Sequence, residues 1–245
     1  MKKELKRQIK QDDLLTGLDL AAHWLKEHLR DVQIALAAAV VLGASAFGVS
    51  YFREARAQEA EKAFSEALAT FHAPLEAELP AGAPPPTSPA YKTAAEKYKK
   101  AAGEFDGVER RYGSLPAGRW ARYYGALARI EMGQVSEAEK TLQELAAGSG
   151  VANPLEAALA RLALAEGYHR AGKTDQALEV YRQMVDDAAA ALPRDHVLMR
   201  LGALLEEQRK FAEAGASYQR LLDVFPASSY AAEAKRRSEY LRTAS

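Results

Sequence analysis

A spacing of small and bulky side chains recurs four times in the last two thirds of this 245-residue chain. The two clearest copies are Thr174, Ala177, Tyr181 and Met184, and Phe211, Ala214, Tyr218 and Leu221. Tyr91, Ala94, Tyr98 and Ala101 form a third copy, and Val135, Ala138, Leu142 and Leu145 a fourth. Positions i, i+3, i+7 and i+10 form one stripe on an α-helix, with the small residue where a neighbouring helix comes closest. The pattern therefore predicts packed helices.

Turn glycines and a second set of helical segments complete helix–turn–helix units around these stripes. Gly133 and Gly172 each precede the small residue of their stripe by five positions. Ala-rich segments at 119–132, 156–171 and 195–208 lie upstream of the turns. The small residues Ala138, Ala177 and Ala214 are then 39 and 37 residues apart. Because the chain also holds 51 alanines, and alanine favours helix over strand, the fold class is predicted to be all-α.

Charge and cysteine content exclude several classes of protein. The 33 Lys and Arg residues balance 33 Asp and Glu residues, which argues against nucleic-acid binding through bulk charge. Without cysteine the chain cannot be a disulfide scaffold, hold a Cys-ligated metal or use a thiol nucleophile.

The segment 32–52 has 21 residues and no charge, which is long enough to cross the hydrocarbon core of a bilayer. An Ala-rich core helix of a soluble domain is the alternative, although such helices rarely lack a polar face over this length. A cleaved signal peptide is disfavoured because 31 residues rich in both signs of charge precede the segment. Charges close to the segment do not decide its orientation, but basic residues between 2 and 10 favour a cytoplasmic N-terminus. We therefore expect a retained anchor that crosses the membrane once.

These features predict five regions. They are a cytoplasmic tail with an amphipathic segment (1–31), a transmembrane helix (32–52), a long membrane-proximal helix (53–79), a Pro-rich loop (80–90) and a helical repeat domain (91–245). A last helix from Ser228 to Thr243 is expected to cap the repeats with a polar face.

The repeats resemble the tetratricopeptide repeat, which carries small, aromatic, glycine and proline residues at set positions of a two-helix unit. The matching residues are Ala165, Tyr168, Gly172, Ala177 and Tyr181 in the clearest unit, Gly202, Ala214, Tyr218 and Pro226 in the next, and Gly125, Gly133 and Ala138 in a degenerate one. The resemblance implies a superhelix of stacked hairpins that binds proteins or peptides.

The whole layout resembles a narrower family, the YfgM-like ancillary subunits of the bacterial Sec translocon. A short cytoplasmic tail, one anchor, a long helix and degenerate repeats carry this resemblance. It implies an inner-membrane protein whose periplasmic domain contacts translocon subunits, emerging polypeptides and periplasmic chaperones. A scaffold for another envelope complex, in division or secretion, would have the same architecture.

The first helix of each hairpin lines the concave surface of such a superhelix, where partners bind. The predicted groove residues are Arg122, Arg129, Glu166, His169, Arg170, Met199 and Glu206.

One motif suggests chemistry instead. Residues 167–174, GYHRAGKT, match the phosphate-binding pattern G-x-x-x-x-G-K-[ST], but that loop needs a buried strand before it and the preceding segment is helical. A P-loop nucleotide hydrolase is therefore a remote alternative. The five histidines show no metal-ligand spacing, so we expect no catalytic residue, no metal and no cofactor.

Overall fold

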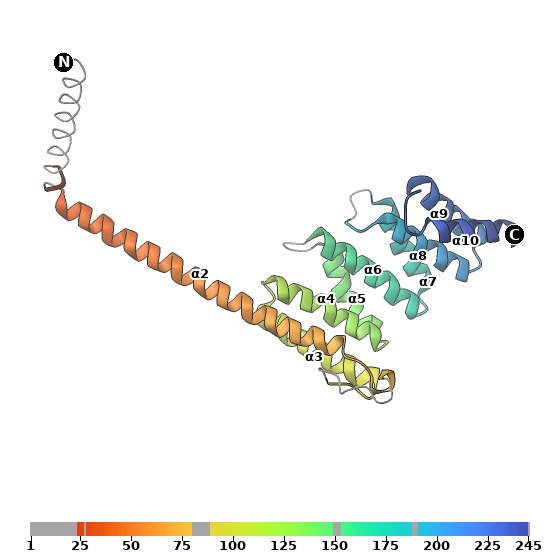
Figure 1. The fold of residues 1–245 in the computed structure, drawn as a ribbon, viewed down its shortest axis with the longest axis horizontal. Coiled ribbons are helices and arrows are strands. Elements are labelled where there is room, and N and C mark those ends of the chain that lie inside the picture. Colours follow the sequence, from red (N-terminus) through yellow and green to blue (C-terminus); the bar gives the residue numbers. More distant parts are fainter. Residues whose placement is uncertain (1–23, 27, 80–88, 149–152, 188–190, 245) are drawn as a thin grey trace, which may run out of the picture. The chain divides into compact units, whose positions relative to one another are not determined.

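The computed structural model describes residues 24–26, 28–79, 89–148, 153–187 and 191–244. These residues form helices joined by turns (Figure 1), together with one isolated backbone bridge between Leu75 and Tyr91. The all-α prediction is confirmed. Most of the predicted cytoplasmic tail and most of the Pro-rich loop lie outside the described residues. The chain divides into two compact units, 1–58 and 59–245.

The predicted transmembrane segment lies in helix α2 (Leu29–Phe71). An 18-residue window of α2 has a mean hydropathy of 2.1 and none of its residues is buried, so the helix is long and apolar enough to cross a membrane. The same helix continues into the predicted membrane-proximal helix but ends at Phe71, eight residues before the predicted end. Pro74 explains the difference, because a proline lacks the N–H group and clashes with the carbonyl four residues earlier.

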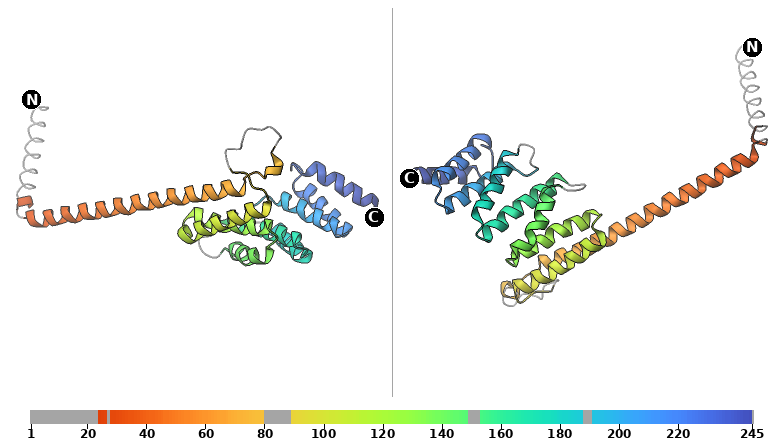
Figure 2. Two further views of the ribbon diagram at one scale, coloured as in Figure 1. Left: turned by 90° about the horizontal axis from the view of Figure 1, so that it is seen from below. Right: turned by 180° about the vertical axis from the view of Figure 1, so that it is seen from behind.

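The second unit is built of antiparallel neighbours. It begins with the last part of α2, from residue 59, and a 3-10 turn at Glu76–Glu78. The helices that follow are α3 (Ala94–Tyr112), α4 (Pro116–Glu131), α5 (Val135–Ala146), α6 (Pro154–Arg170), α7 (Thr174–Asp186), α8 (Arg194–Glu207), α9 (Phe211–Val224) and α10 (Ala231–Ala244). Each helix from α3 to α10 packs against the next one along the chain, and α4 also touches α6. Figure 2 shows the hairpins α4–α5, α6–α7 and α8–α9 stacked in sequence order, with α10 on the last.

The same turn connects the two helices of all three hairpins. Gly133, Gly172 and Arg209 have φ angles of 76°, 72° and 58°, in the left-handed region. In the α6–α7 turn the Gly172 N–H donates to the His169 carbonyl and the Lys173 N–H to the Tyr168 carbonyl, which is the Schellman pattern. The other two turns make the equivalent pair of bonds. The turn fixes the register, since the buried Ala138, Ala177 and Ala214 each follow it by five residues.

In α3 the buried stripe differs from the first predicted one. Ala94 is exposed and Tyr98 only half-buried, whereas Ala101, Phe105 and Val108 are buried seven residues further on. The Phe105 ring lies 5.9 Å from Phe64 and 6.2 Å from Phe71, both in α2. Packing against these aromatic rings selects the second of two stripes that have the same spacing in the sequence.

The other predicted packing residues fall into two groups. Ala165, Tyr168, Tyr181, Gly202 and Tyr218 are buried, and Tyr168 donates a hydrogen bond to Glu139 Oε1 at 2.8 Å. Pro226 is exposed, two residues after the end of α9, where it follows the helix without packing in the core.

Candidate partner-binding groove

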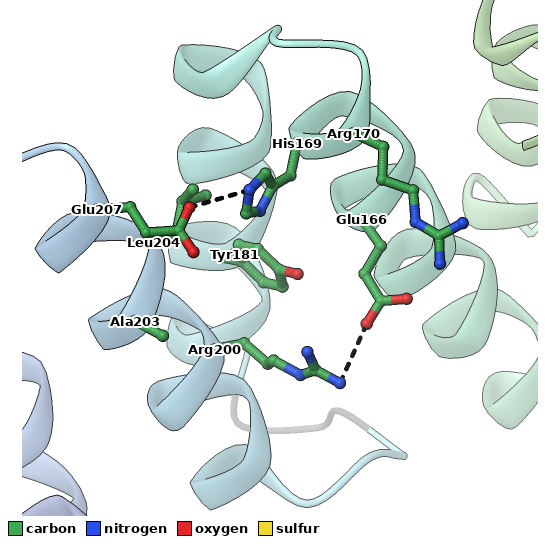
Figure 3. Close-up of a pocket in the computed structure, with 8 residues that line it drawn as sticks. All are labelled: Glu166, His169, Arg170, Tyr181, Arg200, Ala203, Leu204 and Glu207. Atoms are coloured by element: carbon green, nitrogen blue, oxygen red, sulfur yellow. Dashed lines mark ion pairs between the residues drawn. The ribbon is translucent and has the colours of Figure 1, made fainter. Parts of the chain in front are cut away.

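A cleft of about 500 Å³ opens between α6 and α8. Its walls carry three of the predicted groove residues, and α7 supplies its floor through Tyr181. The residues that line it are Glu166, His169, Arg170, Tyr181, Arg200, Ala203, Leu204 and Glu207 (Figure 3). Residues 34 positions apart therefore meet across the cleft, as the stacking of successive first helices requires.

Two ion pairs join the walls of the cleft. His169 Nε2 lies 3.0 Å from Glu207 Oε2, and Arg200 Nη2 lies 3.5 Å from Glu166 Oε1. In Figure 3 the Tyr181 ring lies between these two pairs. Burial, with the nearby Glu166 carboxylate, raises the pKa of Tyr181 to about 12, so its hydroxyl stays protonated at physiological pH.

Met199 and Glu206 line a second cleft, of about 270 Å³, on the other side of α8. Glu206 accepts a hydrogen bond from the Tyr218 hydroxyl at 3.1 Å and from Arg237 Nη1 at 2.9 Å, which connects α8 to α9 and α10. Ala203 and Glu207 border both clefts. The two clefts are thus neighbours on either side of an exposed alanine, and we refer to them together as the α6–α8–α10 groove.

Arg122 and Arg129 line neither of these two clefts, and both are held by carboxylates of neighbouring helices. Arg129 donates two hydrogen bonds to the Asp106 carboxylate of α3, at 2.8 and 3.0 Å. The turn register makes Arg129 the equivalent of Tyr168, the residue that packs on the preceding hairpin, because each stands four residues before its turn glycine.

Arg122 pairs with Glu144 in α5, and its Nε lies 3.4 Å from Glu109 in α3. It therefore joins α3 to α5. The degenerate repeat could be aligned in two ways that differ by one residue, and the turn decides between them: Ala126, and not Gly125, stands seven residues before the turn glycine, as Ala165 does in the next repeat.

The groove also contains residues that the sequence did not identify. Arg200, Ala203 and Glu207 share one face of α8, at i, i+3 and i+7. The turn residues Gly172 and Arg209 are 37 positions apart. The positions in α8 that correspond to Glu166, His169 and Arg170 of α6 are therefore Ala203, Glu206 and Glu207, which the sequence alone could have predicted.

The phosphate-binding pattern has a different structural context here. Its residues 167–170 are the last turn of α6, and Thr174 is the first residue of α7. The Lys173 ammonium lies 3.0 Å from Glu139 Oε2. A helix in place of the strand, and a lysine held by a carboxylate, do not make the loop that cradles phosphate.

One protein family and two solved structures match this chain. A family described as a tetratricopeptide repeat-like domain matches residues 22–237. Two crystal structures of a putative kinesin light chain from Podosopora anserina with nearly identical TPR-like repeats, one of them a point variant, are 18% and 17% identical to this chain. Each match covers 60% of this chain and has a TM-score of 0.46. It covers 87% of the first solved chain and 86% of the second. No curated protein matches the sequence.

The family match spans well over half of the chain, and it includes all three hairpins and their turns. This chain therefore belongs to the tetratricopeptide repeat-like domain family.

Proposed function

We propose that the chain is a membrane-anchored interaction module and that its α6–α8–α10 groove binds protein partners. The observation that carries the proposal is the pair of clefts that share Ala203 and Glu207, because they form an open concave surface on successive first helices. The family match supports protein partners in general, since stacked helical hairpins present such surfaces as interaction scaffolds.

Site-specific photocrosslinking tests the groove. A photoreactive phenylalanine at Ala203 is expected to crosslink a partner protein in intact cells, because this exposed residue borders both clefts. The matched control is the same substitution at Ala216, an exposed alanine of α9 that borders neither cleft. Crosslinks of equal yield from both positions, or none from Ala203, would rule out the groove as the binding surface.

The proposed anchor is the apolar segment 32–52 of α2, with the N-terminus in the cytoplasm and the repeat domain in the periplasm. Support comes from the uncharged segment of α2, in whose apolar window no residue is buried, and from the basic residues between 2 and 10. A reporter fused after Ser245 that is active only in the periplasm is expected. Activity only in the cytoplasm would reverse the topology.

The proposed cellular role is that of an accessory to the Sec translocon, which contacts emerging polypeptides and periplasmic chaperones. The order of tail, anchor, long helix and repeats supports it, through the resemblance to the YfgM-like family. Crosslinked co-purification of the full chain from native membranes is expected to recover translocon subunits, and a version with an unrelated span in place of 32–52 is expected to lose them. Recovery of a division or secretion complex instead would favour the rival scaffold role.

A further inference from the structure

Two ion pairs cross the α6–α8 cleft, and they differ in their dependence on pH. His169 Nε2 of α6 lies 3.0 Å from Glu207 Oε2 of α8, a contact that we refer to as the His169–Glu207 bridge. Arg200 of α8 lies 3.5 Å from Glu166 of α6, on the other side of the Tyr181 ring (Figure 3). A guanidinium stays charged throughout, whereas histidine is the side chain whose charge normally changes between pH 5 and 8. Acid therefore changes the first pair and not the second.

The His169–Glu207 bridge gains strength when the imidazole is protonated. A neutral imidazole donates one hydrogen bond to the carboxylate, and an imidazolium adds the attraction between opposite charges. The Tyr181 hydroxyl, from α7, stays uncharged because burial raises the pKa of Tyr181 to about 12. The charged groups that line the cleft around His169 are two arginines and two glutamates: Arg170, Arg200, Glu166 and Glu207. They balance one another, so the direct contact with Glu207 decides the sign.

The bridge connects two helices that are otherwise joined through a third. Both α6 and α8 pack against α7, which supplies the floor of the cleft, and His169 and Glu207 tie the two walls directly. In Figure 3 the Tyr181 ring lies between the bridge and the Arg200–Glu166 pair. A stronger bridge therefore draws the walls together and narrows the way to this ring.

We propose that the His169–Glu207 bridge is a pH-dependent strap, which closes the α6–α8 cleft in acid and releases it at neutral pH and above. The strap itself stands on the geometry of the cleft, and its effect on partners rests on the proposed groove function. Because the two side chains are 42% and 56% exposed, water screens their attraction. We therefore expect acid to raise the ratio of closed to open clefts about two- to fivefold.

A distance measurement tests the strap without any partner. The chain has no cysteine, so nitroxide labels can be attached at Ala171→Cys and Gln208→Cys alone. Both residues are exposed, and they follow the last residues of α6 and α8 at equivalent places in the two turns. Electron paramagnetic resonance on the full chain in mild detergent is expected to give a shorter mean distance at pH 5.5 than at pH 8.

Substitutions assign this response to His169. In His169→Gln the side chain is neutral at both pH values, so the longer distance is expected at both. In His169→Lys the side chain is charged at both, so the shorter distance is expected at both. Two variants with opposite effects cannot both be explained by misfolding. The matched control is His196→Gln, since His196 lies on α8 but contacts Tyr230 at 2.9 Å, and this variant is expected to keep the response of the unmodified chain.

Photocrosslinking at Ala203 in native membranes tests the consequence for partners. The yield is expected to be about two- to fivefold lower at pH 5.5 than at pH 8, to lose this dependence in His169→Gln and to stay low in His169→Lys.

An equal distance at the two pH values, or an unaltered response in His169→Gln, would overturn the strap. Crosslinking yields that do not follow the distance would show that the strap does not control access to the cleft. An absence of crosslinks at both pH values would reject the proposed binding surface, and the distance measurement would still decide whether the strap exists.

Discussion

At the scale of single residues, close helix approach depends on which small residue stands at a contact. Gly202 of α8 lies against the ring of Tyr218, and a Cβ built on Gly202 would be 2.5 Å from Tyr218 Cε1. Tyr218 is fully buried and its hydroxyl is bonded to Glu206, so the ring has little room to move. A glycine is therefore required here by packing and not by backbone conformation.

Gly202→Ala is expected to lower the free energy of unfolding by about 1–3 kcal/mol, the usual cost of overpacking a core. The control is Gly215→Ala in α9, where an added Cβ meets nothing within 4 Å. There the better helix propensity of alanine is expected to raise stability by about 0.5–1 kcal/mol. Urea unfolding followed by circular dichroism measures both. A Gly202→Ala protein as stable as the unmodified chain would contradict the close packing.

The buried Glu156 of α6 is another residue whose environment the sequence does not reveal. Its side chain is 5% exposed, and Oε2 lies 3.6 Å from Arg119 Nε, while Oε1 has no hydrogen-bond partner among the described residues. Replacement of both partners, with Arg119→Met and Glu156→Met together, is expected to be neutral or stabilising by about 1 kcal/mol, because apolar groups of similar size remove the desolvation cost of a poorly paired buried ion pair. Loss of stability by more than about 1 kcal/mol in thermal unfolding would show that the pair is better formed than its geometry suggests.

At the scale of helices and turns, the sequence predicted which hairpins form better than it predicted which residues of a helix are buried. The three hairpins follow from local signals: turn glycines, alanine content and the spacing of small and bulky residues. The first stripe was misplaced by seven residues because Ala94, Tyr98 and Ala101 have the same spacing as Ala101, Phe105 and Val108. Only the contact with the aromatic rings of α2 distinguishes the two, and that contact joins segments far apart in the sequence.

The groove residues were likewise predicted correctly only where the sequence aligns the repeat without ambiguity. Glu166, His169 and Arg170 line the predicted surface because their repeat is the most regular, and its turn glycine sets the alignment. Arg122 and Arg129 do not, because the degenerate repeat could be aligned in two ways. The 37-residue spacing of the turns reaches Glu207 but not Arg200, which lines the cleft because of where α8 lies relative to α6.

The three inter-helix turns allow a test of the shared Schellman pattern. Arg209 occupies the left-handed position at φ 58°, where glycines stand in the other two turns. Left-handed backbone costs a non-glycine residue about 1–2 kcal/mol, and the added entropy of an unfolded glycine offsets about half of this. Arg209→Gly is therefore expected to raise the free energy of unfolding by roughly 0.5–1 kcal/mol.

Gly172→Ala is the reciprocal variant, because an added Cβ there meets nothing within 4 Å and only the backbone conformation opposes it. It is expected to lower stability by about 1 kcal/mol. Arg209→Gly should thus raise the midpoint of thermal unfolding, and Gly172→Ala should lower it. A destabilised Arg209→Gly protein would mean that the arginine side chain contributes more than its backbone conformation costs.

His196 connects α8 to the segment before α10 and makes that junction sensitive to pH. Its Nδ1 lies 2.9 Å from the Tyr230 hydroxyl, and burial, followed by the nearby Arg200, lowers the pKa of His196. The unfolded chain then takes up the proton first as pH falls, so this contribution to stability is complete above about pH 6.5 and declines below it. The decline ends at the lower pKa of the folded state.

The free energy of unfolding is therefore expected to fall as the pH is lowered through about 6.5, and to fall less in His196→Gln. Subtracting the two proteins removes the contribution of the other titrating groups. Titration of the His196 ring by NMR should give a midpoint below about 6.5. A midpoint above that value, or an equal fall in both proteins, would contradict the burial of the neutral imidazole.

At the scale of the whole repeat domain, each helix contacts mainly the next one along the chain. Stability in such a stack is a sum of local terms, so damage at one end is not expected to reach the other. Ala234 of α10 is fully buried, whereas Ala232 in the same helix is exposed. A charge at Ala234 should therefore separate α10 from the stack without unfolding the hairpins at the other end.

In Ala234→Asp, hydrogen exchange is expected to accelerate in α9 and α10 and to stay unchanged in α4 and α5, because a buried carboxylate without a partner is strongly disfavoured. Ala232→Asp adds the same charge to the same helix at an exposed position and should leave exchange unaltered throughout. Hydrogen exchange read by mass spectrometry resolves the two regions. Equal acceleration of exchange in α4 and α9 would show that the domain unfolds as one cooperative unit. A partner bound at the groove would then stabilise every repeat, and not only the repeats that border the groove.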